Sequence, residues 1–133
     1  MAKYVYPAVF TPAEEGGYNI SFPDVKNCFT QADDLSTGIE MATDVLSLML
    51  WQYEEDGTPI LPPTPIKELS SDDESFTTLI CADTLDYRKR FGKQSVKKTL
   101  TIPSWLDEMA KSNNLNFSNV LQEALAERLH VTL

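Results

Sequence analysis

Most of the side chains in this sequence that could carry out chemistry are carboxylates, since its 133 residues include 20 Asp and Glu, one His and two Cys. Metal-dependent hydrolysis needs several carboxylates that converge on two ions about 4 Å apart. The first predicted strand, 3–10, has no acid, and the acids elsewhere fall in predicted turns, helix caps and loops. His130, the single histidine, is better explained as terminal surface than as a general base. We therefore predict that the protein is not an enzyme and has no catalytic residues, metal site or cofactor.

The charges divide the chain into two parts of different character. Residues 1–92 contain sixteen acidic and six basic side chains, a net charge of −10, whereas residues 93–133 contain four acidic and five basic ones. Basic side chains gather around the start of the second part, at Arg88, Lys89, Arg90, Lys93, Lys97 and Lys98. The positive charge is thus placed where a DNA backbone could bind, and the acidic part suits a basic protein partner.

The second part begins with a short predicted strand. Residues 96–102 alternate, so that Leu100 and Ile102 share one face. Pro103 prevents the strand from continuing as a paired one, and Ser104 is a suitable N-cap for a helix that starts at the next residue.

Two helices are predicted after this strand. The first stalls near 112–114, and Asn116 caps a second whose apolar stripe consists of Phe117, Val120, Leu121, Ala124, Leu125 and Leu129. One strand and one helical hairpin leave an unpaired edge and an uncovered apolar face. A second copy would remove both defects by pairing the two strands and packing four helices beneath them. The dimer core would then contain Leu100, Ile102, Val120, Leu121 and Leu125.

This pattern resembles the ribbon-helix-helix class of DNA-binding domains. The similarity rests on the alternating strand, the run T-I-P-S-W-L, the Asn-capped second helix and its V-L-Q-E-A-L core. It implies that a dimer places two strands in the major groove, with base contacts from Lys97, Thr99 and Thr101. It also implies a phosphate site at the start of the second helix, formed by Asn116, Phe117 and Ser118. Asn114 occupies the turn where the class usually has a left-handed Gly. The alternative is an ordinary helical hairpin preceded by a strand without a role in DNA binding.

The first part predicts an α+β domain. Alternating apolar residues indicate strands at 3–10, 18–22, 28–31 and 76–82, and Pro7 suggests that part of the first strand lies at a sheet edge. Asp33 or Asp34 caps a helix of about five turns, ended by Asp56-Gly57, whose predicted face is Leu35, Ile39, Ala42, Leu46, Met49 and Tyr53. An extended proline-rich segment, 58–65, follows. The expected product is a three-strand meander, a helix on one face and a returning strand.

The run from Gly16 to Leu35 resembles the signature of HicB-type antitoxins. The matching positions are Tyr6, Pro7, Ala8, Phe10, Gly17, Tyr18, Phe22, Pro23, Asp24, Cys28, Thr30, Asp33, Leu35, Ala42 and Leu46. The sequence departs from the family at 25–27, where Leu-Pro-Gly is common, and at Ala32, where Gly is common. The resemblance implies a truncated ribonuclease-H-like fold that, in some members, is followed by a ribbon-helix-helix.

The resemblance also implies a partner, a small basic HicA-type ribonuclease that cleaves mRNA. Acidic side chains could cover its RNA-binding surface, and the candidates for toxin contacts are Glu14, Glu15, Asp24, Glu54, Glu55 and Asp56. The two cysteines, Cys28 and Cys81, are predicted to be buried free thiols. No apolar run approaches twenty residues and no signal-peptide layout is present, so we expect a cytoplasmic protein that does not bind membranes.

Together these features predict two domains: a toxin-neutralising domain at 1–91 and a ribbon-helix-helix DNA-binding and dimerisation domain at 92–133. The expected function is that of an antitoxin that occludes its toxin and represses its own operon at an inverted-repeat operator. The expected assembly is a homodimer or a higher oligomer. The alternative is a stand-alone ribbon-helix-helix regulator whose first domain senses a small molecule or only dimerises. A neighbouring reading frame for a small basic protein would distinguish the two.

Overall fold

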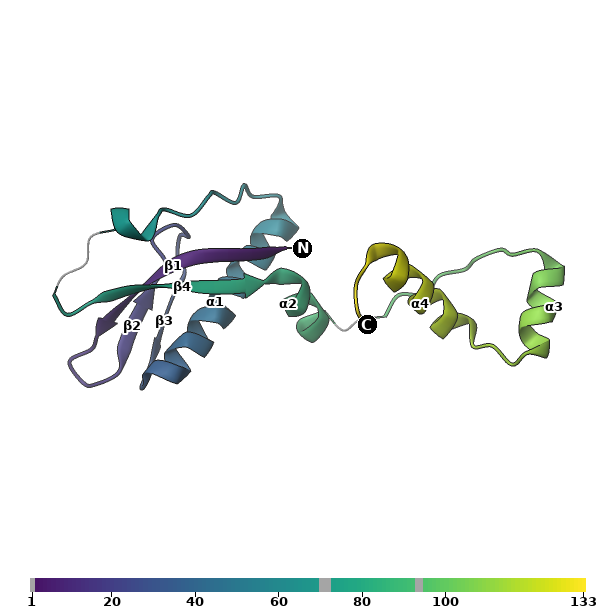
Figure 1. Cartoon of the computed structure of the whole chain (residues 1–133), viewed down its shortest axis with the longest axis horizontal. Coiled ribbons are helices and arrows are strands. Elements are labelled where there is room, and N and C mark those ends of the chain that lie inside the picture. Colours follow the sequence, from purple (N-terminus) through teal and green to yellow (C-terminus); the bar gives the residue numbers. More distant parts are fainter. Residues whose placement is uncertain (1, 70–72, 93–94) are drawn as a thin grey trace. The chain divides into compact units, whose positions relative to one another are not determined.

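The computed structural model describes residues 2–69, 73–92 and 95–133, and its contacts divide the chain into two compact units, 1–94 and 95–133 (Figure 1). The first unit contains an antiparallel sheet in the order β3-β2-β1-β4, formed by β1 (Lys3–Pro12), β2 (Tyr18–Ser21), β3 (Phe29–Ala32) and β4 (Phe76–Asp83). The unit also contains helices α1 (Leu35–Asp56) and α2 (Thr84–Phe91), so the predicted α+β class is confirmed.

The C-terminal end of strand β1 lies between two neighbouring strands, whereas its N-terminal half lies at an edge of the sheet. Strand β4 pairs with β1 from Lys3 to Phe10, whereas β2 pairs with it only from Val9 onward. Pro7 therefore lies in the half of β1 that, among the described residues, has β4 as its one strand neighbour. A proline is compatible with this position because it has no N–H to donate to a second neighbour, and the predicted edge location is confirmed.

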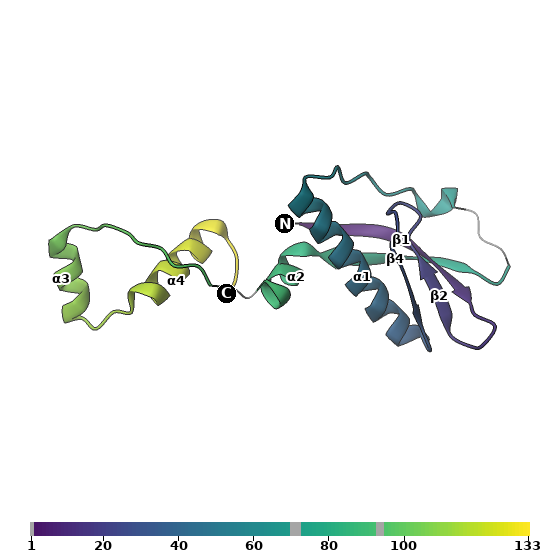
Figure 2. The same cartoon turned by 180° about the vertical axis from the view of Figure 1, so that it is seen from behind.

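Helix α1 (Leu35–Asp56) covers one face of the sheet, as the view from behind shows (Figure 2). Its N-cap is Asp34, whose carboxylate accepts a hydrogen bond from the Thr37 N–H at 2.8 Å, and its C-cap is Gly57, with φ 71°. Both termini agree with the sequence-based prediction, and both conformations are those that these residue types favour at helix ends.

The buried face of α1 differs from the predicted stripe. The side that packs on the sheet follows a four-residue spacing through Gly38, Ala42, Leu46 and Leu50. Leu35 and Ile39 were predicted to face the core but are exposed. Gly38 explains the difference, because a Cβ at this position would meet Phe10 and Ile20 at 3.1 and 3.2 Å. The helix therefore approaches the sheet most closely at its smallest residue, and this contact sets its rotation.

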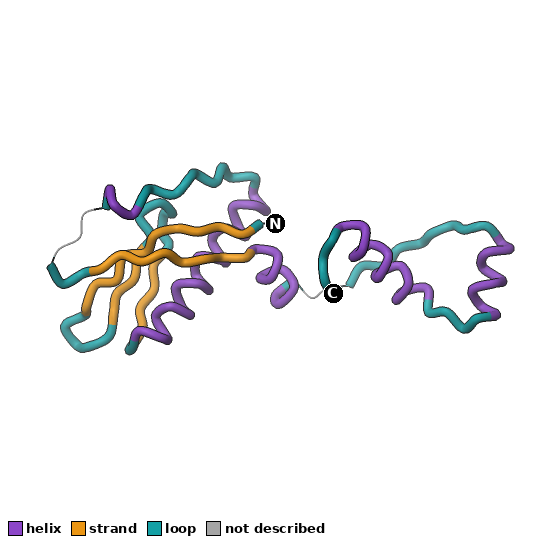
Figure 3. Tube along the Cα trace, viewed as in Figure 1, coloured by secondary structure: helices purple, strands orange, loops and turns teal. Residues whose placement is uncertain are grey.

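The proline-rich segment runs along the first unit as an extended strap, drawn as loop in Figure 3. It is held by a hydrogen bond from the Tyr6 hydroxyl to the Leu61 carbonyl. It is also held by Asp24, whose carboxylate accepts from the N–H of Thr64 at 3.0 Å and from its hydroxyl at 2.5 Å. A short 3-10 turn, η1 (Ile66–Glu68), follows. Asp24 therefore has a structural role in this fold.

Helix α2 (Thr84–Phe91) was not predicted. Its N-cap is Asp83, which accepts from the Asp86 N–H at 3.1 Å. The ring of Tyr87 packs between Trp51 of α1 and Phe91, with ring centroids 5.6 and 4.6 Å apart. The helix was missed because its contacts with α1 come from single side chains rather than from a periodic apolar stripe.

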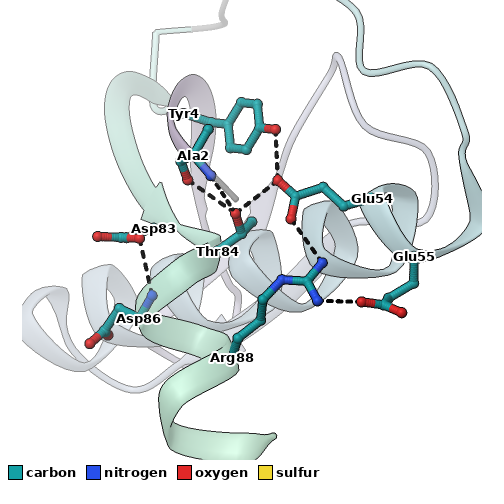
Figure 4. A network of polar contacts seen from close by, with 8 residues as sticks. All are labelled: Ala2, Tyr4, Glu54, Glu55, Asp83, Thr84, Asp86 and Arg88. Carbon is teal, nitrogen blue, oxygen red and sulfur yellow. Dashed lines mark hydrogen bonds and ion pairs between the residues drawn. The ribbon is translucent and has the colours of Figure 1, made fainter. Parts of the chain in front are cut away.

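A network of polar contacts joins β1, α1 and α2 (Figure 4). One carboxylate oxygen of Glu54 accepts from the hydroxyls of Tyr4 and Thr84, both at 2.8 Å, and the other accepts from Arg88 at 3.2 Å. Arg88 also pairs with Glu55. Burial alone raises the pKa of Glu54, but hydrogen bonds from partners that include these three side chains outweigh it and lower the pKa to about 2. Arg88 is thus engaged within the first unit, which corrects its assignment to a DNA-binding cluster.

The two cysteines lie in different environments. Cys28 is buried, and burial raises the pKa of its thiol to about 12. Cys81 is exposed, so the prediction of two buried thiols is wrong for this residue. Ile80 and Ala82, its neighbours in β4, are buried against α1, and strand alternation directs Cys81 to the opposite face.

The second unit consists of an extended connection followed by α3 (Ser104–Ser112) and α4 (Phe117–Leu129). Helix α3 begins one residue earlier than predicted: Pro103 is the N-cap, and its carbonyl accepts from the N–H groups of Leu106 and Asp107. The helix can start earlier because the φ angle of proline is fixed, here at −59°, and this value suits the start of a helix. Asn114, with φ 55°, adopts the left-handed conformation that the sequence predicted.

The Glu54 network should make the stability of the first unit dependent on pH. Because folding lowers the pKa of Glu54 from 4.5 to about 2, its stabilisation is complete above pH 4.5 and is lost as the pH falls to about 2. We expect Glu54→Gln to destabilise the protein at pH 7 by roughly 1–3 kcal/mol, and this difference should shrink in acid. Urea unfolding from pH 7 to pH 2 measures it. Glu55→Gln is the control, because Glu55 pairs with the same arginine from an exposed position and should change stability by less than about 1 kcal/mol. An equal loss at all pH values in Glu54→Gln would contradict the role of its charge.

Candidate functional site

The second unit leaves most of its apolar side chains uncovered. Of its described apolar residues, Ala126 alone is buried. Four of the five residues predicted for a dimer core are exposed, Leu100 by 62%, Ile102 by 42%, Val120 by 44% and Leu125 by 52%, while Leu121 is half-buried. Domains of fewer than about 40 residues usually need oligomerisation or another stabilising contact, and an apolar surface of this extent is typical of an interface.

The residues that the sequence predicted for DNA binding lie in two segments of this unit. Lys97, Thr99 and Thr101 are exposed in the connection before α3, where residues 95–103 form no ladder with another described segment of the same chain. The predicted strand therefore stays a prediction that depends on a second copy.

The other three predicted residues, Asn116, Phe117 and Ser118, lie at the start of α4 and are exposed. Asn116 is the N-cap, as predicted, and its side-chain oxygen accepts from the Asn119 N–H at 3.1 Å. The first-turn N–H groups and the helix dipole make such a terminus favourable for an anion. Sequence and structure agree on this local geometry.

The predicted toxin-binding acids do not form one cluster. Asp24 holds the strap, Glu54 belongs to the buried network, and Glu55 pairs with Arg88. Glu14 and Glu15 are exposed in the turn between β1 and β2, and Asp56 is exposed at the end of α1. Glu14, Glu15 and Asp33 are among the residues that line a shallow hollow at the turn between β1 and β2.

A surface that the sequence reasoning missed lies on the face of the sheet opposite α1. We call it the open face, because no described helix covers it (Figures 1 and 2). Its apolar members are Val5, Val9, Phe29, Leu79 and Cys81, together with Pro7, which is buried. Val5 is 45% exposed, Leu79 56% and Phe29 68%. Both strand faces are apolar in the runs 3–10 and 79–82, and this departure from simple alternation was the signal that could have revealed it.

The described residues contain no group of three or more His, Cys, Asp or Glu side chains arranged to hold a metal ion. Within the same residues, no helix combines the length and the apolar character that a membrane span requires.

Comparison with known proteins identifies similar chains. Residues 6–125 match the model of the HicB_like antitoxin of bacterial toxin-antitoxin system. "Antitoxin HicB 1" from Photorhabdus laumondii is 43% identical over 61 residues, which are 46% of this chain and 39% of that protein. The chain covers less than half the length of the first curated relatives that it matches.

Two solved structures share the fold. A chain of a toxin–antitoxin complex from Streptococcus pneumoniae is 28% identical, with a TM-score of 0.61, over 95% of this chain and 99% of that one. The antitoxin HicB of Burkholderia pseudomallei is 15% identical, with a TM-score of 0.54, over 95% of this chain and 98% of that one. At this lower identity the similarity shows the fold alone.

Proposed function

Because the chain belongs to the HicB-like antitoxin family of bacterial toxin–antitoxin systems, we propose that it neutralises a small HicA-type ribonuclease by covering the toxin's RNA-binding surface. The family match over 6–125 is the observation that carries this proposal. The structural match to a chain from a toxin–antitoxin complex supports it over nearly the whole length.

The charge of the first part supports the same role. A protein that binds RNA presents basic side chains to phosphates, and residues 1–92 offer it a net charge of −10. Exposed carboxylates such as Glu14, Glu15 and Asp56 would lie where RNA phosphates otherwise bind. Such inhibition is steric and electrostatic and needs no catalytic residue, cofactor or metal.

A second role, repression of its own operon, is proposed for the second unit. Two copies would pair residues 96–102 as an antiparallel ribbon and cover the exposed Leu100, Ile102 and Leu125 with each other's helices. The outward residues of that ribbon would read an inverted repeat in the major groove, while the start of α4 would bind phosphate. Both partners, an mRNA-cleaving toxin and operator DNA, lie in the cytoplasm, and we propose this location for the protein.

Co-expression tests the antitoxin role. The toxin is expected in a neighbouring reading frame that encodes a small basic protein. Its expression alone should stop growth, and co-expression of this chain should restore growth and yield a complex that co-purifies. Continued growth arrest at equal or higher levels of the folded chain would overturn the proposal. If operator binding persisted in that case, the alternative of a stand-alone regulator would be supported.

Dimerisation through the ribbon can be tested with Leu100→Asp. This change would bury an unpaired charge in the shared core, and we expect sedimentation to show monomers or aggregates in place of dimers. Thr99→Asp places the same charge at the neighbouring residue on the opposite face and should remain dimeric. A stable, folded Leu100→Asp dimer would place the dimer contact elsewhere.

Base reading and phosphate binding make different predictions. Lys97→Ala and Thr99→Ala should weaken binding to the operator by roughly 1–3 kcal/mol each, with a smaller effect on random DNA. Ser118→Glu should weaken binding to both kinds of DNA alike, because it places a negative charge beside the helix end that binds phosphate. Competition binding at fixed salt separates the two patterns. Equal losses on operator and random DNA in the first two variants would exclude the ribbon as the reading element.

A further inference from the structure

We propose that the toxin binds to the open face of the sheet, through an apolar band with an acidic end. This inference rests on the proposed antitoxin function and specifies the surface that performs it. The sheet register, the exposure of the strand residues and the distribution of charge at the ends of the strands each contribute to it.

The register brings the apolar side chains of the open face together. Val9 pairs with Ser21 on one side and with Thr77 on the other, and Ser21 pairs with Phe29. Leu79 is two residues from Thr77 along β4, which makes it a diagonal neighbour of Val9. Val5 pairs with Cys81 and is the other diagonal neighbour of Leu79. These residues therefore form a band from β3 to β4, in which Ser21 separates Phe29 from Val9 and the partner of Leu79, Pro7, is buried.

This band differs in composition from a sheet face that is exposed to solvent. An antiparallel sheet with one wet face normally places polar side chains outward. Here Val5, Phe29 and Leu79 occupy outward positions and are each about half exposed or more. Single exposed apolar residues are common, but a contiguous patch with a polar border is typical of an interface.

Polar and acidic residues border the band at one end. The next row of the sheet contains Gln31, Asn19 and Thr11, and Thr11 accepts a hydrogen bond from the Ser75 hydroxyl at 3.1 Å. Some of these polar residues and Phe29 line one shallow hollow. Beyond this row lie four exposed acids from two neighbouring loops, Glu14, Glu15, Asp73 and Glu74. The pairing of Phe10 with Phe76 places these loops at the same end of the sheet.

The charge identifies the occupant as a basic protein rather than a second copy of this chain. A copy would bring a second surface with a net charge of −10 against the first. A small basic toxin with an apolar patch beside its RNA-binding side chains would match both the band and its acidic end. The toxin's cationic side chains would then lie against carboxylates, which explains how binding at this face would compete with RNA.

Helix α1 presents the rival surface. Leu35, Ile39 and Met41 are exposed on it by 40–46%, but they are interrupted by polar residues and by the exposed acids Glu40 and Asp44. This arrangement is that of an ordinary solvated helix with scattered apolar side chains. Ile39 has nearly the same exposure as Val5, and it therefore provides a matched control on the opposite side of the domain.

The test uses the full chain and a purified, catalytically inactive variant of the toxin in calorimetric titrations. Leu79→Lys replaces an apolar contact by a charge that would repel a basic partner, and we expect affinity to fall about tenfold or more. Val5→Lys provides a second variant within the band, on the neighbouring strand β1. Ile39→Lys should bind the toxin like the unmodified chain. Thermal melting of each variant establishes that it is folded before binding is compared.

The outcomes distinguish failure of this inference from failure of the proposed function. If the unmodified chain does not bind the toxin, the proposed function fails, and this inference fails with it. If the unmodified chain binds and both open-face variants bind equally well, the antitoxin role stands and the open face is excluded. A loss of binding in Ile39→Lys alone would place the toxin on α1. If Leu79→Lys lowers the mass of the unbound chain in sedimentation, a second copy covers the open face and the inference is wrong.

Discussion

The half-buried carboxylate of Glu54 is the contact on which the arrangement of the first unit depends. It lies near the end of α1 and accepts hydrogen bonds from β1 through Tyr4 and from α2 through Thr84 and Arg88. A carboxylate at this depth is costly to desolvate, and it remains charged only because its oxygens are satisfied by several donors. Three segments that are distant in sequence are thereby fixed together. Because Glu54 and Arg88 are paired with each other, they are not assigned to the binding of toxin or DNA.

Two apolar surfaces remain once the interior of the protein has formed. One is the open face of the first unit, and the other is the uncovered side of the second unit around Leu100 and Leu125. Their surroundings differ in charge, because acidic loops border the first and the second belongs to the part with a small positive charge. This difference is the physical basis for assigning them to different partners, a basic toxin and a second copy of the chain bound to DNA. An antitoxin with these properties would be stabilised by each partner, since binding favours the folded state.

Separation of charge along the chain is compatible with both roles only because the two units are distinct. An acidic surface within the second unit would oppose the proposed approach to DNA phosphates, and a basic surface within the first unit would repel the proposed toxin partner. The ion pairs of Arg88 with Glu54 and Glu55 reduce the positive charge at the end of the first unit. The positive charge that we propose for DNA binding is carried by the second unit, at Lys97 and its neighbours.

The sequence by itself determined the features that depend on local energies. Asp34, one of two candidate caps, Asn116 as the cap of α4, Gly57 at the end of α1 and Asn114 in its left-handed turn were predicted, as was the order along the chain of the elements other than α2, because each depends on residues only a few positions apart. The HicB resemblance was also evident from the sequence, and the family match agrees with it.

The tertiary structure decided which side chains are available to partners. The sequence made Asp24 and Glu54 candidates for toxin contacts on the same grounds as Glu14 and Glu15. In the structure, however, Asp24 binds Thr64, 40 residues away, and Glu54 binds Thr84, 30 residues away, so both acids have structural roles. The rotation of α1, the helix α2 and the exposure of Cys81 were likewise not predicted. Each depends on which face of an element meets which neighbour, as Gly38 meets Phe10, and periodicity alone does not contain that information. Local chemistry therefore fixed the elements, and long-range packing selected the surfaces that they present.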